Sequence, residues 1–288
     1  LGNVALDLPT SLIQGSQTLF GAKTQLKFGR ATVDLIAASS KGKRQEINIT
    51  GKAQIQEFQL GADNYEANRH YFLNLYYKDH YDEGMSTVPI VNSTININRI
   101  EVWLTNTTNK TDNTRNIIGF TDLGEAKESN CEGNPGSYSV TELPSNNANG
   151  IYQWASVDEP NIRTFVNSVA SLSSQASQPG PFEQAVNYEK VENARKLTEQ
   201  EFTYNAQLGF ISLNLPLNND QVLAVAYEYT YRGETYQVGE FSTDGIDGQD
   251  ALILKLLKPT ITNPKNKLWD LMMKNVYSIG AYQVGQVG

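Results

Sequence analysis

The chain reads Gln221-Val-Leu-Ala-Val-Ala-Tyr-Glu-Tyr-Thr-Tyr231, then Arg232-Gly233, then Glu234-Thr-Tyr-Gln-Val-Gly-Glu-Phe241, and this stretch decides the fold class. Valine, tyrosine and threonine recur in both runs, and β-branched and aromatic residues favour strands. Two turn residues ending in glycine between two such runs are typical of a tight hairpin. The stretch therefore predicts two antiparallel strands.

Strand patterns continue on both sides of this hairpin. Ser93–Thr105 alternates apolar and polar residues, and Leu208–Leu213 and Ala251–Leu257 are short apolar runs. Between residues 18 and 60 a period of two predicts strands with one buried face.

Turns and a bulge are expected between and within the N-terminal strands. We expect turns at Gly29-Arg30 and Lys41–Arg44, a strand over Ile47–Ile55, and a β-bulge at Glu57-Phe58, where the period slips.

Helical spacing appears in three places. Residues 65–84 follow a capping-box-like start at Asp63, apolar residues recur every three or four positions over 162–172, and residues 268–277 predict a short helix. Residues 106–150 are rich in Asn, Thr, Gly and Ser and predict long surface loops.

These patterns predict an α+β fold that is mainly β, with antiparallel sheets and a few helices. We divide the chain into an alternating β segment over 1–60, an α+β sub-domain over 61–180, an antiparallel β sub-domain over 181–260 and a helix or linker over 261–288.

Charge and hydropathy exclude two classes. The net charge is −8, with an acidic middle and basic ends, which argues against nucleic-acid binding because that needs a clustered basic surface. No run approaches the roughly 18 apolar residues of a membrane-spanning helix, although membrane β-strands leave a weaker pattern. The chain starts at Leu1 without a signal-peptide pattern, so we expect an internal fragment.

Catalytic chemistry has little support. His70 and His80 are ten residues apart, whereas a zinc pair on a helix needs a separation of four, and the single Cys131 lies in a predicted loop. No nucleophile elbow or phosphate-binding loop is present. We expect no enzyme activity.

One loop has metal-like chemistry. Asp244, Asp247 and Asp250 alternate with glycines, and clustered oxygen ligands suit calcium, although the spacing differs from an EF-hand and no Glu closes the site. The alternative is a polar loop between strands. Seven tyrosines either line a sugar- or peptide-binding surface or cover a sheet with their hydroxyls in water, and we favour the second interpretation. They are Tyr71, Tyr76, Tyr77, Tyr227, Tyr229, Tyr231 and Tyr236.

Several longer runs resemble the SprA/Sov family of type IX secretion and gliding-motility proteins. The runs are Asn68–Leu73, Ile97–Asn106, Ala194–Leu197 with Leu208–Leu213, Val222–Tyr229, Tyr236–Phe241 and Leu268–Tyr277. They span nearly the whole chain in order, and the stretch 107–149 does not follow the resemblance.

The resemblance implies an N-terminal part of a very large outer-membrane β-barrel, a translocon that exports folded cargo with type IX sorting domains. Residues 61–260 are then an insertion domain that faces the cell exterior or the barrel lumen, as a cap or border of the channel. The implied partners are that cargo, accessory outer-membrane translocon proteins and, through the parent barrel, the membrane. No catalytic residue or cofactor carries over.

A second hypothesis belongs to a different class. The tyrosines and the aspartate loop also suit a free-standing cell-surface adhesin or a carbohydrate-binding β module.

Overall fold

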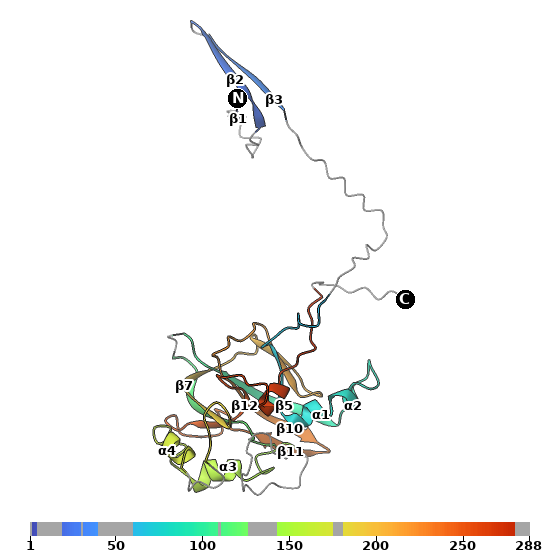
Figure 1. The fold of residues 1–288 in the computed structure, drawn as a ribbon, viewed down its shortest axis with the longest axis vertical. Helices are drawn as coiled ribbons and strands as arrows, with labels where there is room; N and C mark the ends of the chain where they lie inside the picture. The colour runs from blue at the N-terminus through green and yellow to red at the C-terminus, as the bar shows by residue number, and fades with distance from the viewer. Residues whose placement is uncertain are drawn as a thin grey trace. The chain divides into compact units, whose positions relative to one another are not determined.

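The structure, a computed structural model, describes residues 2–4, 19–29, 31–39, 60–108, 111–125, 143–174 and 181–279 (Figure 1). The chain forms two compact units, Leu1–Glu57 and Phe58–Gly288, called unit 1 and unit 2. Strands dominate and the helices are short, so the predicted fold class, α+β and mainly β with antiparallel sheets, is confirmed.

Unit 1 contains a three-stranded antiparallel sheet. β1 (Gly2–Val4) pairs with β2 (Leu19–Phe28), and β2 pairs with β3 (Ala31–Ser39). At the predicted turn Gly29 has φ of 61°, which glycine adopts without steric cost.

The buried face that the sequence predicts for these strands is not found where side chains are described. Leu26 and Phe28 are 40% and 67% exposed, because the described strands of unit 1 form a single layer. The expected turn at 41–44, the strand over 47–55 and the bulge at 57–58 lie outside the described residues.

Unit 2 is built around a ring of five strands. In order around the ring they are β5 (Ile95–Leu104), β10 (Leu223–Tyr231), β12 (Leu252–Lys258), β6 (Thr114–Phe120) and β7 (Tyr188–Lys196). The last strand, β7, pairs with the first, β5, through two residue pairs, and this pairing closes the ring. β6 and β12 are parallel, whereas the other neighbours are antiparallel.

The hairpin and the strands that the sequence predicts most strongly are confirmed. β11 (Glu234–Val238) follows β10 through Arg232 and Gly233, whose φ values of 50° and 89° fit a type I′ turn. The predicted strands over 93–105 and 251–257 are β5 and β12.

β6 and β12 carry apolar side chains on both faces, and this creates two cores. Ile117 and Leu254 belong to the core inside the ring. Their neighbours Ile118 and Ile253 belong to a second core, because successive side chains of a strand point to opposite faces.

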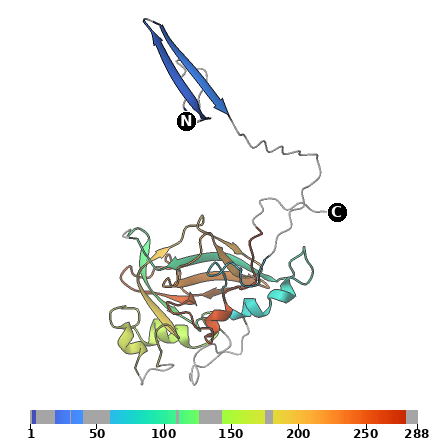
Figure 2. The ribbon, with the colours of Figure 1, turned by 45° about the horizontal axis from the view of Figure 1, so that its top comes forward.

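Short helices cover the second core. They are α3 (Ile151–Gln153), the π-helical turn η1 (Trp154–Asp158) and α4 (Ser168–Leu172). Figure 2 shows α3 and α4, in yellow-green, on one side of the strands of unit 2.

A second sheet packs on the core inside the ring. Its order is β4 (His70–Phe72), β9 (Phe210–Leu213) and β8 (Phe202–Asn205), and α1 (Leu75–Asp79) and α2 (Tyr81–Gly84) follow β4. Near the C-terminus lies the 3₁₀-helix η2 (Lys267–Asp270).

All three predicted helices differ from the structure. Over 162–172 only α4 is helical. The helix expected over 65–84 starts only at α1, because residues 70–72 form β4 and pair with β9. The helix expected over 268–277 is reduced to η2. After η2 the backbone pairs with β4 instead: the Phe72 amide donates to the Leu271 carbonyl, and the Met273 amide donates to the His70 carbonyl.

The predicted loop region contains a strand. Within 106–150, residues 114–120 form β6. The ring joins strands from both 61–180 and 181–260, so these ranges share one sheet within unit 2. Among the described residues no helix is long and apolar enough to cross a membrane.

Candidate functional site

The three aspartates considered for calcium lie in the loop between β11 and β12. Asp244 Oδ2 accepts hydrogen bonds from the Gln237 side chain and the Phe241 amide, each at 3.0 Å. Asp247 Oδ1 accepts one from the Gln249 amide at 2.9 Å. These bonds shape the loop from within.

An arginine occupies the inner side of this loop. Arg115 Nη2 donates to the carbonyl oxygens of Asp247 at 2.5 Å and of Asp250 at 3.2 Å. Within the described ranges no three acidic, histidine or cysteine side chains gather as a metal site. The structure therefore does not bring Asp244, Asp247 and Asp250 together as ligands, and calcium at this loop stays a prediction.

A buried ion pair fixes the segment after β6 to β12. Lys255 Nζ lies 2.8 Å from Glu125 Oε1, and both side chains are at most 2% exposed. Nζ also donates to the Thr121 carbonyl, and the Leu75 amide donates to Glu125 at 3.2 Å. Burial raises the pKa of Glu125, and the neighbouring Lys255 opposes this rise. Both charged groups therefore lie inside the protein.

A second ion pair fastens the helical segment to the sheet. Arg163 donates to both carboxylate oxygens of the buried Glu240, at 2.5 and 3.2 Å. Tyr152 Oη and the Ile253 amide donate to the same carboxylate at 3.1 and 2.9 Å. Burial, reinforced by the Glu240 charge, raises the pKa of Tyr152 to about 12.

His70 brings together residues that are far apart in the sequence. Its Nδ1 lies 2.8 Å from Ser212 Oγ, and its Nε2 lies 2.9 Å from Glu66 Oε2. The hydrogen bond to His70 is the main cause that lowers the pKa of Glu66, and Arg69 also lowers it. A hydroxyl, an imidazole and a carboxylate in a row are the parts of a nucleophile relay.

The surroundings of His70 favour a structural role for this row. His70 is 8% exposed, and the two roomiest cavities described below, of about 380 and 400 Å³, are not lined by His70 or Ser212. Both ring nitrogens are engaged, so the row ties β4 to β9.

The tyrosines considered for a binding surface are mostly buried. Tyr71, Tyr77, Tyr227 and Tyr229 are at most 3% exposed, and the first three have buried hydroxyls without a hydrogen-bond partner. Burial raises the pKa of all four. The prediction that these hydroxyls lie in water is wrong, because all four side chains belong to the main hydrophobic core. The aromatic rings of Tyr77, Tyr227 and Tyr229 pack against one another there.

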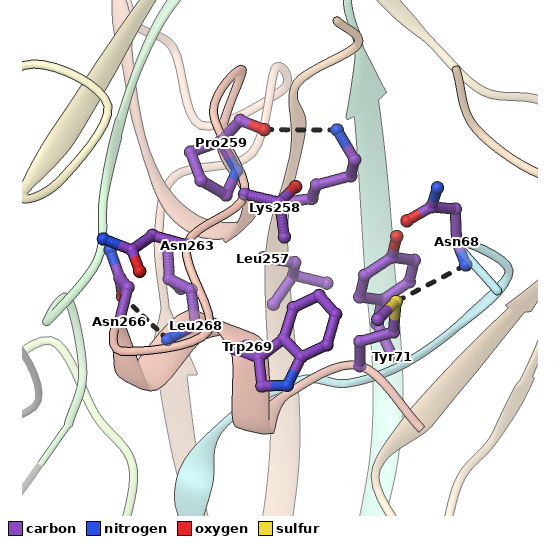
Figure 3. Close-up of a pocket in the computed structure, with 11 residues that line it drawn as sticks. Asn68, Tyr71, Leu257, Lys258, Pro259, Asn263, Asn266, Leu268 and Trp269 are labelled. Carbon is purple, nitrogen blue, oxygen red and sulfur yellow. Dashed lines mark hydrogen bonds between the residues drawn. The ribbon is translucent and has the colours of Figure 1, made fainter. Parts of the chain in front are cut away.

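A small cavity lies between η2 and β12 (Figure 3). Its volume of about 10 Å³ approaches the space that one water molecule needs. Lys258 Nζ donates to the carbonyls of Asn219, Gln221 and Pro259 at 2.8, 2.8 and 3.2 Å. Burial lowers the pKa of Lys258. The ammonium is thus satisfied by carbonyls and has a structural role.

A larger, polar cleft of about 380 Å³ opens between α1 and the β10–β11 hairpin. Tyr76 of α1 and His80, the residue that follows α1, line it, with their rings stacked at 4.1 Å between centroids. Tyr231 and Arg232 line it from the hairpin, and the Arg232 guanidinium lies 5.0 Å from the centre of the Tyr231 ring. This cleft is the best candidate for a ligand site on unit 2. A shallower cavity of about 400 Å³ lies beside α2 and residues 272–275.

The first and last described segments of unit 2 are joined. The Glu66 amide donates to the Val276 carbonyl at 2.8 Å, and Tyr277 Oη donates to the Ala62 carbonyl at 3.0 Å. Figure 1 shows the two segments side by side at one end of the unit. Residues 62–66 and 276–277, near the two limits of the described part of unit 2, therefore lie together.

The sequence did not predict the cleft or the two buried ion pairs, Lys255–Glu125 and Arg163–Glu240. His80 and Arg232 are 152 positions apart in number, and no local pattern relates them. Tyr76 and Tyr231, which line the cleft, were among the tyrosines considered for a binding surface, although the sequence did not place them together. Cys131 lies outside the described residues.

The family model SprA_N, described as motility related/secretion protein, matches residues 2–230. No curated protein matches this sequence.

Proposed function

Because the chain belongs to the SprA_N family of motility-related and secretion proteins, we propose that unit 2 is a non-enzymatic body of a protein-export channel in the outer membrane. In this proposal the body borders or caps the channel and contacts exported cargo or accessory proteins. It works by shape and packing.

The joined ends of unit 2 carry this proposal. A domain inserted into a longer polypeptide must return it near the point where it entered, and domains with adjacent termini tolerate such insertion. The bonds Glu66–Val276 and Tyr277–Ala62 provide that geometry. A body of this kind can be presented by a channel without interrupting the channel's own structure.

The interior chemistry supports a passive role. Glu125, Glu240 and His70 are the buried titratable groups that most resemble catalytic ones. Glu125 is paired with Lys255, and Glu240 is paired with Arg163. His70 is hydrogen-bonded to Ser212 on one ring nitrogen and to Glu66 on the other. Polar groups used in this way hold segments of the core together.

A free-standing carbohydrate-binding module is less favoured. Four of the tyrosines that suggested it, among them Tyr77 and Tyr227, lie in the core, whereas Tyr76 and Tyr231 line the cleft. The family match points to secretion. Sugar binding by aromatic stacking needs exposed rings.

Site-specific photo-crosslinking tests the proposed contact with cargo. Leu215 and Val166 are 78% and 82% exposed, so a photoreactive amino acid fits there without disturbing a core. In cells that export a tagged cargo protein through the full-length channel, we expect light-dependent adducts between the channel and that cargo.

The control is the same cargo without its export signal, which should form no adduct. If export proceeds normally and neither position ever links to cargo or to a co-purifying accessory protein, the proposed docking role is contradicted.

A further inference from the structure

We propose that the cleft between α1 and the β10–β11 hairpin binds an extended peptide segment through a single carboxylate paired with Arg232. The carboxylate belongs either to an acidic residue of the peptide or to its free C-terminus. The choice of a peptide as the ligand rests on the proposed function, whereas the carboxylate rests on the cleft itself.

The charge of Arg232 is the first reason. The other arginines of the described ranges have oxygen partners: Arg69, Arg99, Arg163 and Arg195 contact carboxylates, and Arg115 contacts carbonyls. Arg232 alone among them has no oxygen partner, and it is exposed. A guanidinium is the group best matched to a carboxylate, because it donates two parallel hydrogen bonds.

The size and lining of the cleft are the second reason. Its volume of about 380 Å³ lies within the range of small-ligand sites, about 300–1,000 Å³. The stacked rings of Tyr76 and His80 and the ring of Tyr231 offer aromatic surface beside the charge. A carboxylate next to an aromatic or apolar side chain fits this combination.

Glu83 limits the charge of the ligand. It lines the same cleft and is exposed. A carboxylate at this place repels a densely charged anion such as a phosphate chain, since like charges at close range disfavour binding. One carboxylate that reaches Arg232 is the better match.

The cleft is held in shape on the hairpin side. Tyr231 pairs with Glu234 across the turn and with Ile95 of β5 on the other side. Arg232 is the first turn residue of the type I′ turn, so its backbone is fixed by the hairpin. A site arranged before binding loses less entropy when the ligand arrives.

Titration of the 288-residue protein with three tetrapeptides tests the proposal by amide chemical shifts in NMR. The probes are acetyl-Ala-Phe-Glu-Ala-amide, acetyl-Ala-Phe-Gln-Ala-amide, and acetyl-Ala-Phe-Gln-Ala with a free C-terminus. We expect at least one carboxylate peptide to shift the resonances of His80, Tyr231 and Arg232. The uncharged amide peptide should bind about tenfold more weakly.

Arg232→Asn is the decisive variant. Asparagine before glycine is favoured in a type I′ turn, so the hairpin is kept while the guanidinium is removed. We expect the affinity for the carboxylate peptide to fall about tenfold. Lys265→Asn removes one positive charge from an exposed residue outside the cleft and should leave the affinity unchanged.

The outcomes separate the sources of the carboxylate. Binding of the glutamate peptide alone assigns an acidic side chain, and binding of the free C-terminus assigns a peptide end. If neither charged peptide binds at the cleft, if the uncharged peptide binds equally well, or if Arg232→Asn changes nothing, the proposal is overturned. The crosslinks from Leu215 and Val166 lie outside the cleft, so they test the proposed function separately.

Discussion

Gly209 and Gly233 both have positive φ, 65° and 89°, but only Gly209 is enclosed. A Cβ on Gly209 would lie 2.1 Å from the Tyr77 ring, whereas a Cβ on Gly233 would meet nothing within 4 Å. We predict that Gly209→Ala lowers the free energy of unfolding by about 3–5 kcal/mol, from overpacking plus backbone strain. Gly233→Ala should cost about 1–2 kcal/mol, from strain alone.

Urea unfolding of the 288-residue protein, followed by tryptophan fluorescence, measures both losses. Gly233→Ala is the control for the part of the loss that comes from backbone strain. Equal losses in the two variants would contradict the packing of Tyr77 against Gly209.

Lys255 and Glu125 make a second residue-scale test. Lys255→Met removes one partner and leaves a buried carboxylate uncompensated, so we predict a loss of about 3–5 kcal/mol. The double variant Lys255→Met with Glu125→Gln should recover part of this loss, because no isolated charge remains.

Lys265→Met, at an exposed position, is the matched control and should change stability by less than about 0.5 kcal/mol. A loss below about 1 kcal/mol for Lys255→Met in the same urea titration would show that the ion pair is not buried as described.

At the scale of single residues, the sequence shows which residue types are present but not which distant residues they contact. The aspartates of the β11–β12 loop could be identified in the sequence. Arg115, which donates a hydrogen bond to the Asp247 carbonyl of that loop, lies more than 130 positions earlier. The same holds for His70 and Ser212, which are 142 positions apart. Long-range pairing decides such sites, and a single sequence contains no local pattern for it.

Among the elements, strands were predicted better than helices. β5, β10, β11 and β12 follow local alternation or a tight turn, and both can be read from neighbouring residues. The expected helix over 65–84 failed at its first half because residues 70–72 gain backbone partners in β9 and in residues 271–273. Tertiary pairing outweighed helical spacing there.

The segment that contains α3, η1 and α4 depends on one ion pair. Arg163→Met leaves Glu240 buried without its cation, so we predict that this segment loosens first. Hydrogen–deuterium exchange should accelerate in residues 151–172 and remain unchanged in β10.

Arg195 provides the matched control, since its pair with Glu201 is more exposed. Arg195→Met should leave exchange in 151–172 unchanged. If Arg163→Met speeds exchange uniformly across unit 2, the segment is not a separate cooperative element.

Acid should weaken the connection between β4 and β9. The hydrogen bond to His70 lowers the pKa of Glu66 below 4.5, so the folded state favours the ionised carboxylate. The stability that Glu66 contributes is therefore present above about pH 4.5 and is lost as the pH falls through its lower folded pKa.

We predict that the fall in unfolding free energy between pH 5 and pH 3 is smaller in Glu66→Gln than in the unchanged protein. Urea titrations at the two pH values measure this difference. An identical fall in both proteins would exclude Glu66 as a contributor.

At the scale of the whole molecule, the family and the fold class were accessible from the sequence, and the ring was not. The resemblance to the SprA/Sov family is confirmed at the level of the SprA_N match over residues 2–230. The ring closes through β5–β7, a contact of two residue pairs between distant segments. Local patterns contain no information about such a closure, which joins strands from both sides of residue 180 in one sheet.

The contacts of Ala62 and Glu66 with Tyr277 and Val276 allow the part of unit 2 between them to be removed as one piece. Residues 63–275 can be replaced by a short Gly-Ser linker between Ala62 and Val276, because neighbouring bonds already hold these ends together. A matched control carries the same linker inserted after Gly245, an exposed loop position where an added Cβ meets nothing within 4 Å.

Export of a tagged cargo protein by cells with either version of the full-length channel measures the central proposal most directly, with the amount of channel in the membrane quantified alongside. We predict that the excised channel reaches the membrane at its normal level and exports cargo at less than about a tenth of the control rate, because a border and docking surface is missing. Export at the control rate by an equal amount of the excised channel would contradict the account.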